Sequence, residues 1–260
     1  MLNAMHKQGV FRLQRQNVNQ IADCDLYFGN HQGPKRIGGP QGGLEVLFST
    51  LLVPDSTRYV LRQSLINYCW PPTQYIKARA VRKPNPIVVC GNDRLQKLQG
   101  KGTWDETKQA AVGLKKERQR VANEIFLSVN AGRPVMIYPE GTRSVTGKIL
   151  PFVSDFMRHT ITDYIVPRME SGKPSRIGLI VAETLQTFAD GVGHGAFLYD
   201  QPVTMRGVLY DTSLVEKQYA QIVHLKGRAF DVALTRLART FALDMRATFA
   251  RELRDILTVD

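Results

Sequence analysis

Apolar and polar residues alternate along this chain in two periods, which together predict strands interleaved with helices. Short apolar runs lie over Asp23 to Asn30, Ile87 to Cys90, Val135 to Tyr138 and Ile177 to Val181. Such runs, ended by glycine, proline or a polar residue, are typical of buried strands, and Ile87 to Cys90 is in addition rich in β-branched residues. The pattern over Arg58 to Ile66 is ambiguous.

Two long helices are predicted from residues that recur at steps of three and four. The first begins at Thr103, which forms a capping box with Glu106, and Gly132 closes it just before Pro134. Its apolar positions are Ala111, Leu114, Val121, Ile125 and Val129. The second helix covers about 229–257, and its apolar positions are Phe230, Leu234, Leu237, Phe241, Met245, Phe249, Leu253 and Ile256. This second pattern is typical of a helix packed on a sheet, and an amphipathic helix on a membrane surface is the alternative.

The order of these elements predicts the fold class. A strand, a helix and a strand follow one another between Ile87 and Tyr138, and this order favours a crossover unit with a largely parallel sheet. We therefore expect an α/β protein with a mostly parallel or mixed central sheet and helices on both faces. At this length we also expect one domain over 1–260.

Charge and composition restrict the function without choosing it. The chain has 35 Lys and Arg against 23 Asp and Glu, a formal net charge of +12. This charge predicts an acidic partner. The three candidates are nucleic acid, an anionic lipid surface, and a substrate that is phosphorylated or bound to an acidic carrier. The longest apolar stretch, Leu44 to Val53, is half of the roughly 20 residues that cross a bilayer. It is read as core, or alternatively as a membrane-contact surface.

The cysteines and the N-terminal sequence predict a cytoplasmic location. Cys24, Cys69 and Cys90 are odd in number and widely spread, so they match neither a disulfide framework nor a zinc site and are read as reduced thiols. The first thirty residues lack the continuous apolar run of a secretory signal.

The strongest chemical signal is the heptad Tyr138 to Ser144, which reads YPEGTRS directly after a predicted buried strand. Ligands of open α/β sheets sit at the carboxyl ends of strands, and Gly141 lets the backbone approach an anion closely. Arg143 offers a planar fork of donors that suits a phosphate. A nucleotide-binding P-loop is excluded, because Ile149 stands where a magnesium-binding Ser or Thr is required.

This heptad closely resembles the FPEGTRS motif of the glycerolipid acyltransferases, the family that includes the glycerol-3-phosphate and lysophosphatidic acid acyltransferases. The resemblance covers about 25–208 and implies the fold of glycerol-3-phosphate acyltransferases, with no metal and no bound cofactor. It also extends to Phe28–His31, which is similar to the start of the family's His-x4-Asp motif. The resemblance implies that His31 is the catalytic base.

Two departures from the family pattern affect this assignment. Arg36 occupies the position of the motif's aspartate. Either another carboxylate supports the imidazole, with Glu140, Glu45 and Asp55 as candidates, or catalysis is weak or absent. The fourth motif of the family has no counterpart, because Ile177 to Glu183 stands in its place without a proline.

The remaining site residues are carried over from the same resemblance. Val88 to Arg94 is similar to the end of the second motif, which implies that Arg94 binds the phosphate of the acceptor; a surface ion pair is the alternative reading of its Asp-Arg pair. The heptad places Glu140 in the catalytic machinery, and its substrate-binding residues are Gly141, Thr142, Arg143 and Ser144.

The implied function is transfer of a fatty acyl group in phospholipid biosynthesis. The donor is acyl-CoA or acyl carrier protein, and the acceptor is the hydroxyl of glycerol 3-phosphate or a lysophospholipid. The alternative is an inactive relative that binds lysophospholipid or anionic membrane lipid. The expected location is the cytoplasm, with peripheral contact at an anionic membrane surface. Nucleic-acid binding rests on charge alone.

Overall fold

The structure is a computed structural model that describes residues 13–30, 49–50, 52–62, 86–89, 103–140, 149–183 and 203–257. The chain divides into two compact units. Unit 1 consists of Met1–Pro54 and Ile137–Asp260, and unit 2 of Asp55–Met136. Both units contain strands and helices, so the predicted mixed α/β class is confirmed. The prediction of a single domain stays a prediction.

The strands of unit 1 form a mixed sheet in the order β1-β7-β6-β2. These strands are β1 (Leu13–Gln16), β7 (Val203–Tyr210), β6 (Ile177–Glu183) and β2 (Leu26–Gly29). The pairs β1 with β7 and β2 with β6 are parallel, whereas β6 and β7 are antiparallel. The predicted strands over Asp23 to Asn30 and Ile177 to Val181 are thereby confirmed, and β1 and β7 were not predicted.

The two faces of this sheet are covered differently. Arg206 and Gly207 are consecutive on β7 and therefore point to opposite faces. Arg206 donates to Glu252 of the long C-terminal helix α11 (Gly227–Leu257) over 3.0 Å. On the other face, a Cβ on Gly207 would meet Ile21 of the short 3-10 helix η1 (Val18–Ile21) at 2.9 Å. The absence of a side chain at Gly207 is what lets η1 pack so closely on the strand.

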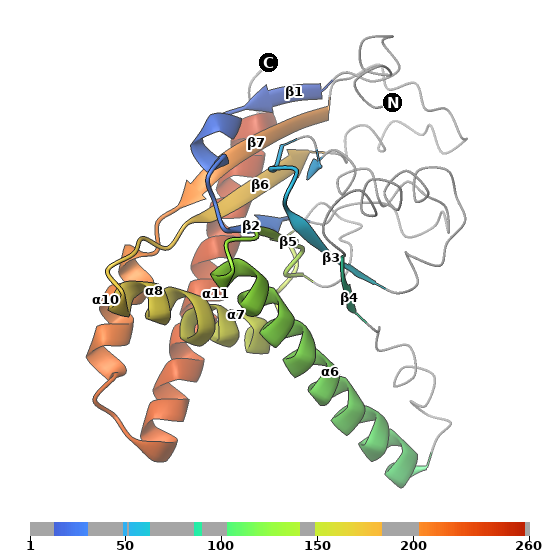
Figure 1. The fold of residues 1–260 in the computed structure, drawn as a ribbon, viewed down its shortest axis with the longest axis vertical. Coiled ribbons are helices and arrows are strands. Elements are labelled where there is room, and N and C mark those ends of the chain that lie inside the picture. The colour runs from blue at the N-terminus through green and yellow to red at the C-terminus, as the bar shows by residue number, and fades with distance from the viewer. Residues whose placement is uncertain are drawn as a thin grey trace. The chain divides into compact units, whose positions relative to one another are not determined.

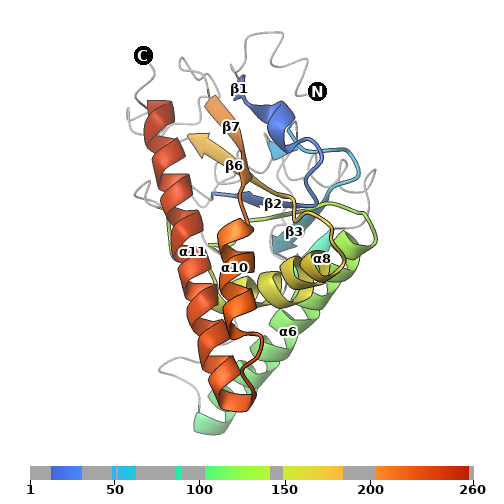
Figure 2. The same cartoon turned by 90° about the vertical axis from the view of Figure 1, so that its left-hand side faces the viewer.

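Helix α11 packs on β6 and β7 along the sheet, as both views show (Figures 1 and 2). Its buried side chains include Leu234, Phe241, Met245, Phe249 and Ile256. This pattern confirms the prediction of a helix packed on the sheet. The preceding helix α10 (Ser213–Ile222) contacts α11 through the rings of Tyr219 and Phe230, whose centroids are 6.4 Å apart.

A further helical segment of unit 1 was not predicted. It runs through α7 (Ser154–Thr160), a π-helical turn η3 (Ile161–Ile165) and α8 (Val166–Glu170). Phe156 of α7 packs edge to face on Phe28 of β2, with ring centroids 5.9 Å apart. Among the residues that the structure describes, no helix combines the length and apolar character that crossing a bilayer requires.

Unit 2 contains the crossover that the sequence predicts. Its strands lie in the order β5-β3-β4, with β3 (Arg58–Arg62) parallel to both β4 (Ile87–Val89) and β5 (Val135–Ile137). Helix α6 (Trp104–Asn130) connects β4 to β5. The ambiguous run that begins at Arg58 is therefore a strand, and the predicted strands at Ile87 and Val135 are confirmed. The last residue of β5 already belongs to unit 1.

The ends of α6 follow the sequence closely. The backbone N–H of Glu106 donates to the Thr103 side chain and the Glu106 carboxylate accepts from the Thr103 backbone, so the capping box is confirmed. Gly132 has a φ of 74°, a left-handed conformation that glycine adopts without strain. Of the predicted apolar positions, Val121, Ile125 and Val129 are buried, but Ala111 is exposed and Leu114 only half-buried. Periodicity predicted the helix correctly and its buried length wrongly.

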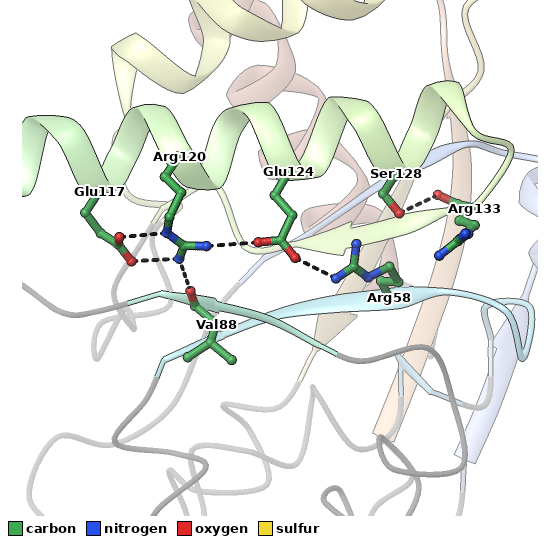
Figure 3. Close-up of polar contacts among 7 residues, drawn as sticks. All are labelled: Arg58, Val88, Glu117, Arg120, Glu124, Ser128 and Arg133. Carbon is green, nitrogen blue, oxygen red and sulfur yellow. Dashed lines mark hydrogen bonds and ion pairs between the residues drawn. The ribbon is translucent and has the colours of Figure 1, made fainter.

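A ladder of charged side chains fastens α6 to the strands of unit 2 (Figure 3). Arg120 donates to the Val88 carbonyl of β4 over 2.6 Å and to the carboxylates of Glu117 and Glu124. The other oxygen of Glu124 accepts from Arg58 of β3 over 2.6 Å. Because Arg58 is only 13 % exposed, its charge needs this carboxylate partner.

Candidate active site

Of the predicted site residues, the structure describes Glu140. His31, Arg94, Gly141, Thr142, Arg143 and Ser144 lie outside the described residues, as do Arg36 and Glu45. The site is therefore built from the residues that flank them, which are Asn30, the segment 138–140 and the segment 149–153. All three belong to unit 1.

Glu140 connects the backbone just before Gly141 to the backbone at Leu150. It follows β5 through Tyr138 and Pro139, and its side chain is 5 % exposed. The carboxylate accepts the backbone N–H of Leu150 over 2.9 Å, and the Pro139 carbonyl accepts the N–H of Val153 over 3.0 Å. The chain thus leaves the strand at Glu140 and returns to it at Leu150. A backbone N–H donor stabilises a buried carboxylate, and here this bond joins the residue before Gly141 to Leu150.

The peptide group between Ile149 and Leu150 is held from both sides. Its N–H donates to Glu140, and its carbonyl accepts from Nη2 of Arg246 on α11 over 2.8 Å. Since the N–H and C=O of a trans peptide point in opposite directions, Glu140 and Arg246 approach it from opposite sides. One turn beyond Arg246 on α11, Phe249 packs edge to face on Phe152, with centroids 6.0 Å apart. The C-terminal helix therefore contacts the segment 149–153, which follows the heptad.

Asn30 anchors the chain at the residue before His31. Its side chain is 2 % exposed. The amide nitrogen donates to the Ala182 carbonyl over 2.8 Å, and the amide oxygen accepts the Ala182 N–H over 2.7 Å. This pair of bonds ties the carboxyl end of β2 to β6. The sequence indicated Asn30 only as part of a motif, and its partner 152 residues away was not predictable from local pattern.

Helix α7 connects these two anchored segments within unit 1. Val153, which bonds Pro139, immediately precedes α7, and Phe156 in the first turn of that helix packs on Phe28 of β2. The backbone before His31 and the backbone before Gly141 are therefore both in contact with α7 or with the residue that precedes it. Such fixed supports are what a catalytic constellation requires.

The described part of Leu44 to Val53 favours the core interpretation over the membrane-contact one. Ser49, Thr50, Leu52 and Val53 are all buried. The Ser49 hydroxyl also lies 3.2 Å from the hydroxyl of Tyr138, the first residue of the heptad. These residues thus pack beside the strand end that leads into the heptad.

Cys24 is buried, and burial raises the pKa of its thiol to about 12. The thiol is protonated at neutral pH and is no nucleophile. Its predicted state, a reduced thiol, agrees with the structure, while Cys69 and Cys90 lie outside the described residues. Within the described ranges, no cluster of three His, Cys, Asp or Glu side chains is suited to hold a metal ion.

Residues 75–169 match the family model described as Acyltransferase. This segment is similar in sequence to the acyltransferase family. The match includes the heptad and Arg94, and it confirms the recognition that the heptad suggested. It begins after His31, so the assignment of His31 as the base stays a prediction.

Two further comparisons accompany this acyltransferase match. The crystal structure of the 1-acyl-sn-glycerophosphate (LPA) acyltransferase PlsC from Thermotoga maritima matches with a TM-score of 0.46 and 11% identity. The match covers 94% of this chain and 76% of that chain. No curated protein matches the chain.

Proposed function

We propose that the protein transfers a fatty acyl group from acyl-CoA or acyl carrier protein to the hydroxyl of glycerol 3-phosphate or a lysophospholipid. The observation that carries this proposal is the heptad YPEGTRS within the acyltransferase match. The family supports acyl transfer in general, and the particular donor and acceptor are proposed here from the basic charge and the phosphate-binding residues of the motif.

In the proposed reaction His31 removes the proton of the acceptor hydroxyl. The oxygen then forms a bond to the thioester carbonyl carbon, and the carbon–sulfur bond breaks as the thiolate leaves and takes the proton from the imidazolium. Arg143 and Arg94 hold the phosphate of the acceptor. Gly141, Thr142 and Ser144 line the acceptor site, where backbone N–H groups stabilise the oxyanion.

The geometry of the described residues supports this scheme, because hydrogen bonds hold the backbone just before His31 and just before Gly141. Asn30 holds the residue before His31, and Glu140 holds the residue before Gly141. Glu140 has one carboxylate oxygen committed to the Leu150 N–H, so its proposed contribution is to organise the motif as well as to supply charge. Asp55, another candidate to support His31, is exposed and belongs to unit 2.

The basic surface of α11 supports an acidic partner. Arg228, Arg236 and Arg239 are exposed, and Leu243, one turn after Arg239 on the same helix, is exposed as well. We propose that these arginines contact an anionic membrane surface at the cytoplasmic side, or the acidic acyl carrier protein. Sedimentation with anionic vesicles is expected to fall in Arg236→Glu/Arg239→Glu. The matched control is Lys115→Glu/Lys116→Glu on the exposed part of α6.

The function is tested by acyl transfer from labelled acyl-CoA and acyl carrier protein to glycerol 3-phosphate and to lysophosphatidate. The wild type is expected to turn over and His31→Ala to lose at least about a hundredfold in rate, the usual share of a general base. Retained activity in His31→Ala would remove His31 from the mechanism. No turnover with any pair of substrates would contradict the proposal itself.

A second candidate function follows from Arg36, which stands where the family has aspartate. A cation there disfavours the imidazolium that forms on proton transfer. The protein would then bind lysophospholipid without turning it over. Activity gained in Arg36→Asp, from an inactive wild type that binds lysophospholipid, would favour this candidate.

A further inference from the structure

Among the residues that the structure describes, Arg246 has no acidic counter-charge. Nη2 donates to the neutral Ile149 carbonyl over 2.8 Å, while Nε is buried without a hydrogen-bond partner. In the part of the chain that the structure describes, no carboxylate forms an ion pair with it. Burying a guanidinium without an anion is costly, so this arrangement needs an explanation.

Comparison with other half-buried arginines shows that this pattern is unusual in the protein. The side chains of Arg58, Arg168 and Arg206 are 13 %, 20 % and 13 % exposed, and each has a carboxylate partner. The acids near Arg246 on α11 are already engaged, since Asp244 accepts from Tyr210 and Glu252 from Arg206. Within the described ranges, the other half-buried arginines have acidic partners, whereas the one partner seen for Arg246 is a backbone carbonyl.

The position of Arg246 indicates what the missing anion is. The carbonyl that it binds belongs to the peptide group whose N–H is held by Glu140, at the point where the chain returns from the heptad. The guanidinium is thus fixed by its own hydrogen bond at Ile149, five residues after the last residue of the heptad. It reaches that place from α11, which lies outside the matched segment 75–169.

We propose that Arg246 is a phosphate-binding residue of this site and takes a phosphate monoester through its remaining N–H donors. A guanidinium fork suits two phosphate oxygens, and a charge already fixed in place loses little entropy on binding. The assignment to the acceptor rests on the proposed function. The phosphate groups of acyl-CoA are the other source of the same chemistry.

The direct test measures binding of inorganic phosphate and of glycerol 3-phosphate by calorimetry, without any acyl donor. Arg246→Gln is expected to bind both about 10- to 100-fold more weakly than wild type, the usual loss for a charged hydrogen bond. Arg246→Lys keeps the charge but loses the fork, and an intermediate affinity is expected. The matched control is Arg158→Gln, because Arg158 also contacts α11 but has Asp231 as its partner.

Each binding result supports or overturns the proposal. Affinity in Arg246→Gln equal to wild type would overturn it, as would an equal loss in Arg158→Gln. Urea unfolding of Arg246→Gln and Arg246→Lys checks that both variants fold. If only Arg246→Lys folds, that variant decides the question, and affinity equal to wild type for both phosphate and glycerol 3-phosphate then overturns the proposal.

Kinetics separate the two sources of phosphate. A raised KM for glycerol 3-phosphate in Arg246→Gln, with KM for glycerol unchanged, assigns Arg246 to the acceptor. If Arg246→Gln raises the KM for acyl-CoA but not the KM for an acyl thioester of N-acetylcysteamine, Arg246 binds the donor. That result overturns the assignment to the acceptor. Wild-type phosphate binding that depends on Arg246, without any acyl transfer, would leave the anion site in place and contradict the proposed function alone.

Discussion

The two long helices, α6 and α11, use similar amphipathic patterns with different results. Helix α11 buries apolar side chains from Leu234 to Ile256 along nearly its whole length. Helix α6 buries its apolar residues only from Val121 onward, and Trp104 and Val112 in its first half are 78% and 50% exposed. The first half of α6 is stabilised by local features, the capping box and charged pairs, whereas α11 is stabilised by the core.

This difference shows that apolar residues at helical spacing predict that a helix forms, but do not by themselves predict that the helix is buried. Local terms such as a cap or an ion pair each contribute about 1 kcal/mol or less, whereas burial of a large side chain contributes several. The contrast between α6 and α11 should therefore appear as a difference in mutational cost, and the predictions below test it in order of expected size.

Phe249→Ala is expected to have the largest effect, about 3–5 kcal/mol of unfolding free energy. Its ring is fully buried and packs on Phe152, so its removal leaves a cavity beside Phe152. Urea denaturation measures the loss. Trp104→Ala in α6 is the matched control and should change stability by less than about 0.5 kcal/mol. Equal losses in the two variants would break the comparison.

Tyr210→Phe is expected to lower the unfolding free energy by about 1–3 kcal/mol at neutral pH. The change removes the hydroxyl that donates to the Asp244 carboxylate on α11 over 2.5 Å. Burial first, and then the bond to Asp244, raises the pKa of Tyr210 above the ordinary value of 10.0. The stability that this group contributes is thus complete below about pH 10 and is lost as the pH rises beyond it.

The alkaline part of this prediction is read from unfolding free energies between pH 8 and pH 11. The wild type should lose up to about 1.4 kcal/mol per pH unit through Tyr210 above pH 10, and the slope should be shallower in Tyr210→Phe. Tyr27 and Tyr164, whose pKa values burial also raises, remain in the variant and keep part of the slope. An unchanged slope would show that Tyr210 is not held in its neutral form.

Thr103→Ala is expected to cost about 1 kcal/mol, because it removes the cap of α6 in a part of the helix that tertiary packing does not support. Amide hydrogen exchange in the first turn measures the fraying directly. Lys108→Ala, an exposed change in the same helix, is the control. Exchange that is no faster in Thr103→Ala would show that packing, not the cap, holds this end.

Arg120→Gln should have the smallest effect, below about 1 kcal/mol at low salt, because its side chain is 49% exposed. The loss should shrink further in 0.5 M salt, since screening weakens exposed pairs. Double-mutant cycles with Glu117→Gln measure the coupling. A loss larger than that of Thr103→Ala would mean that the bond to the Val88 carbonyl, rather than the charges, fastens α6.

The sequence determined those elements whose formation depends on neighbouring residues. The capping box of Thr103 and Glu106, the end of α6 at Gly132 and the buried strands at Leu26, Ile87 and Ile177 all depend on contacts or propensities within a few positions. The acyltransferase heptad was also visible, because its chemistry is concentrated in seven adjacent residues.

Tertiary structure alone decided which parts of these elements are buried and which distant groups meet. Asn30 finds Ala182 152 residues away, and Arg246 reaches Ile149 from a helix 97 residues further along. Neither pairing has a local signature, because an amide or a guanidinium is satisfied by any backbone carbonyl that the fold brings near. The sequence identified the motif, whereas only the packing of α11 and β6 showed what holds it in place.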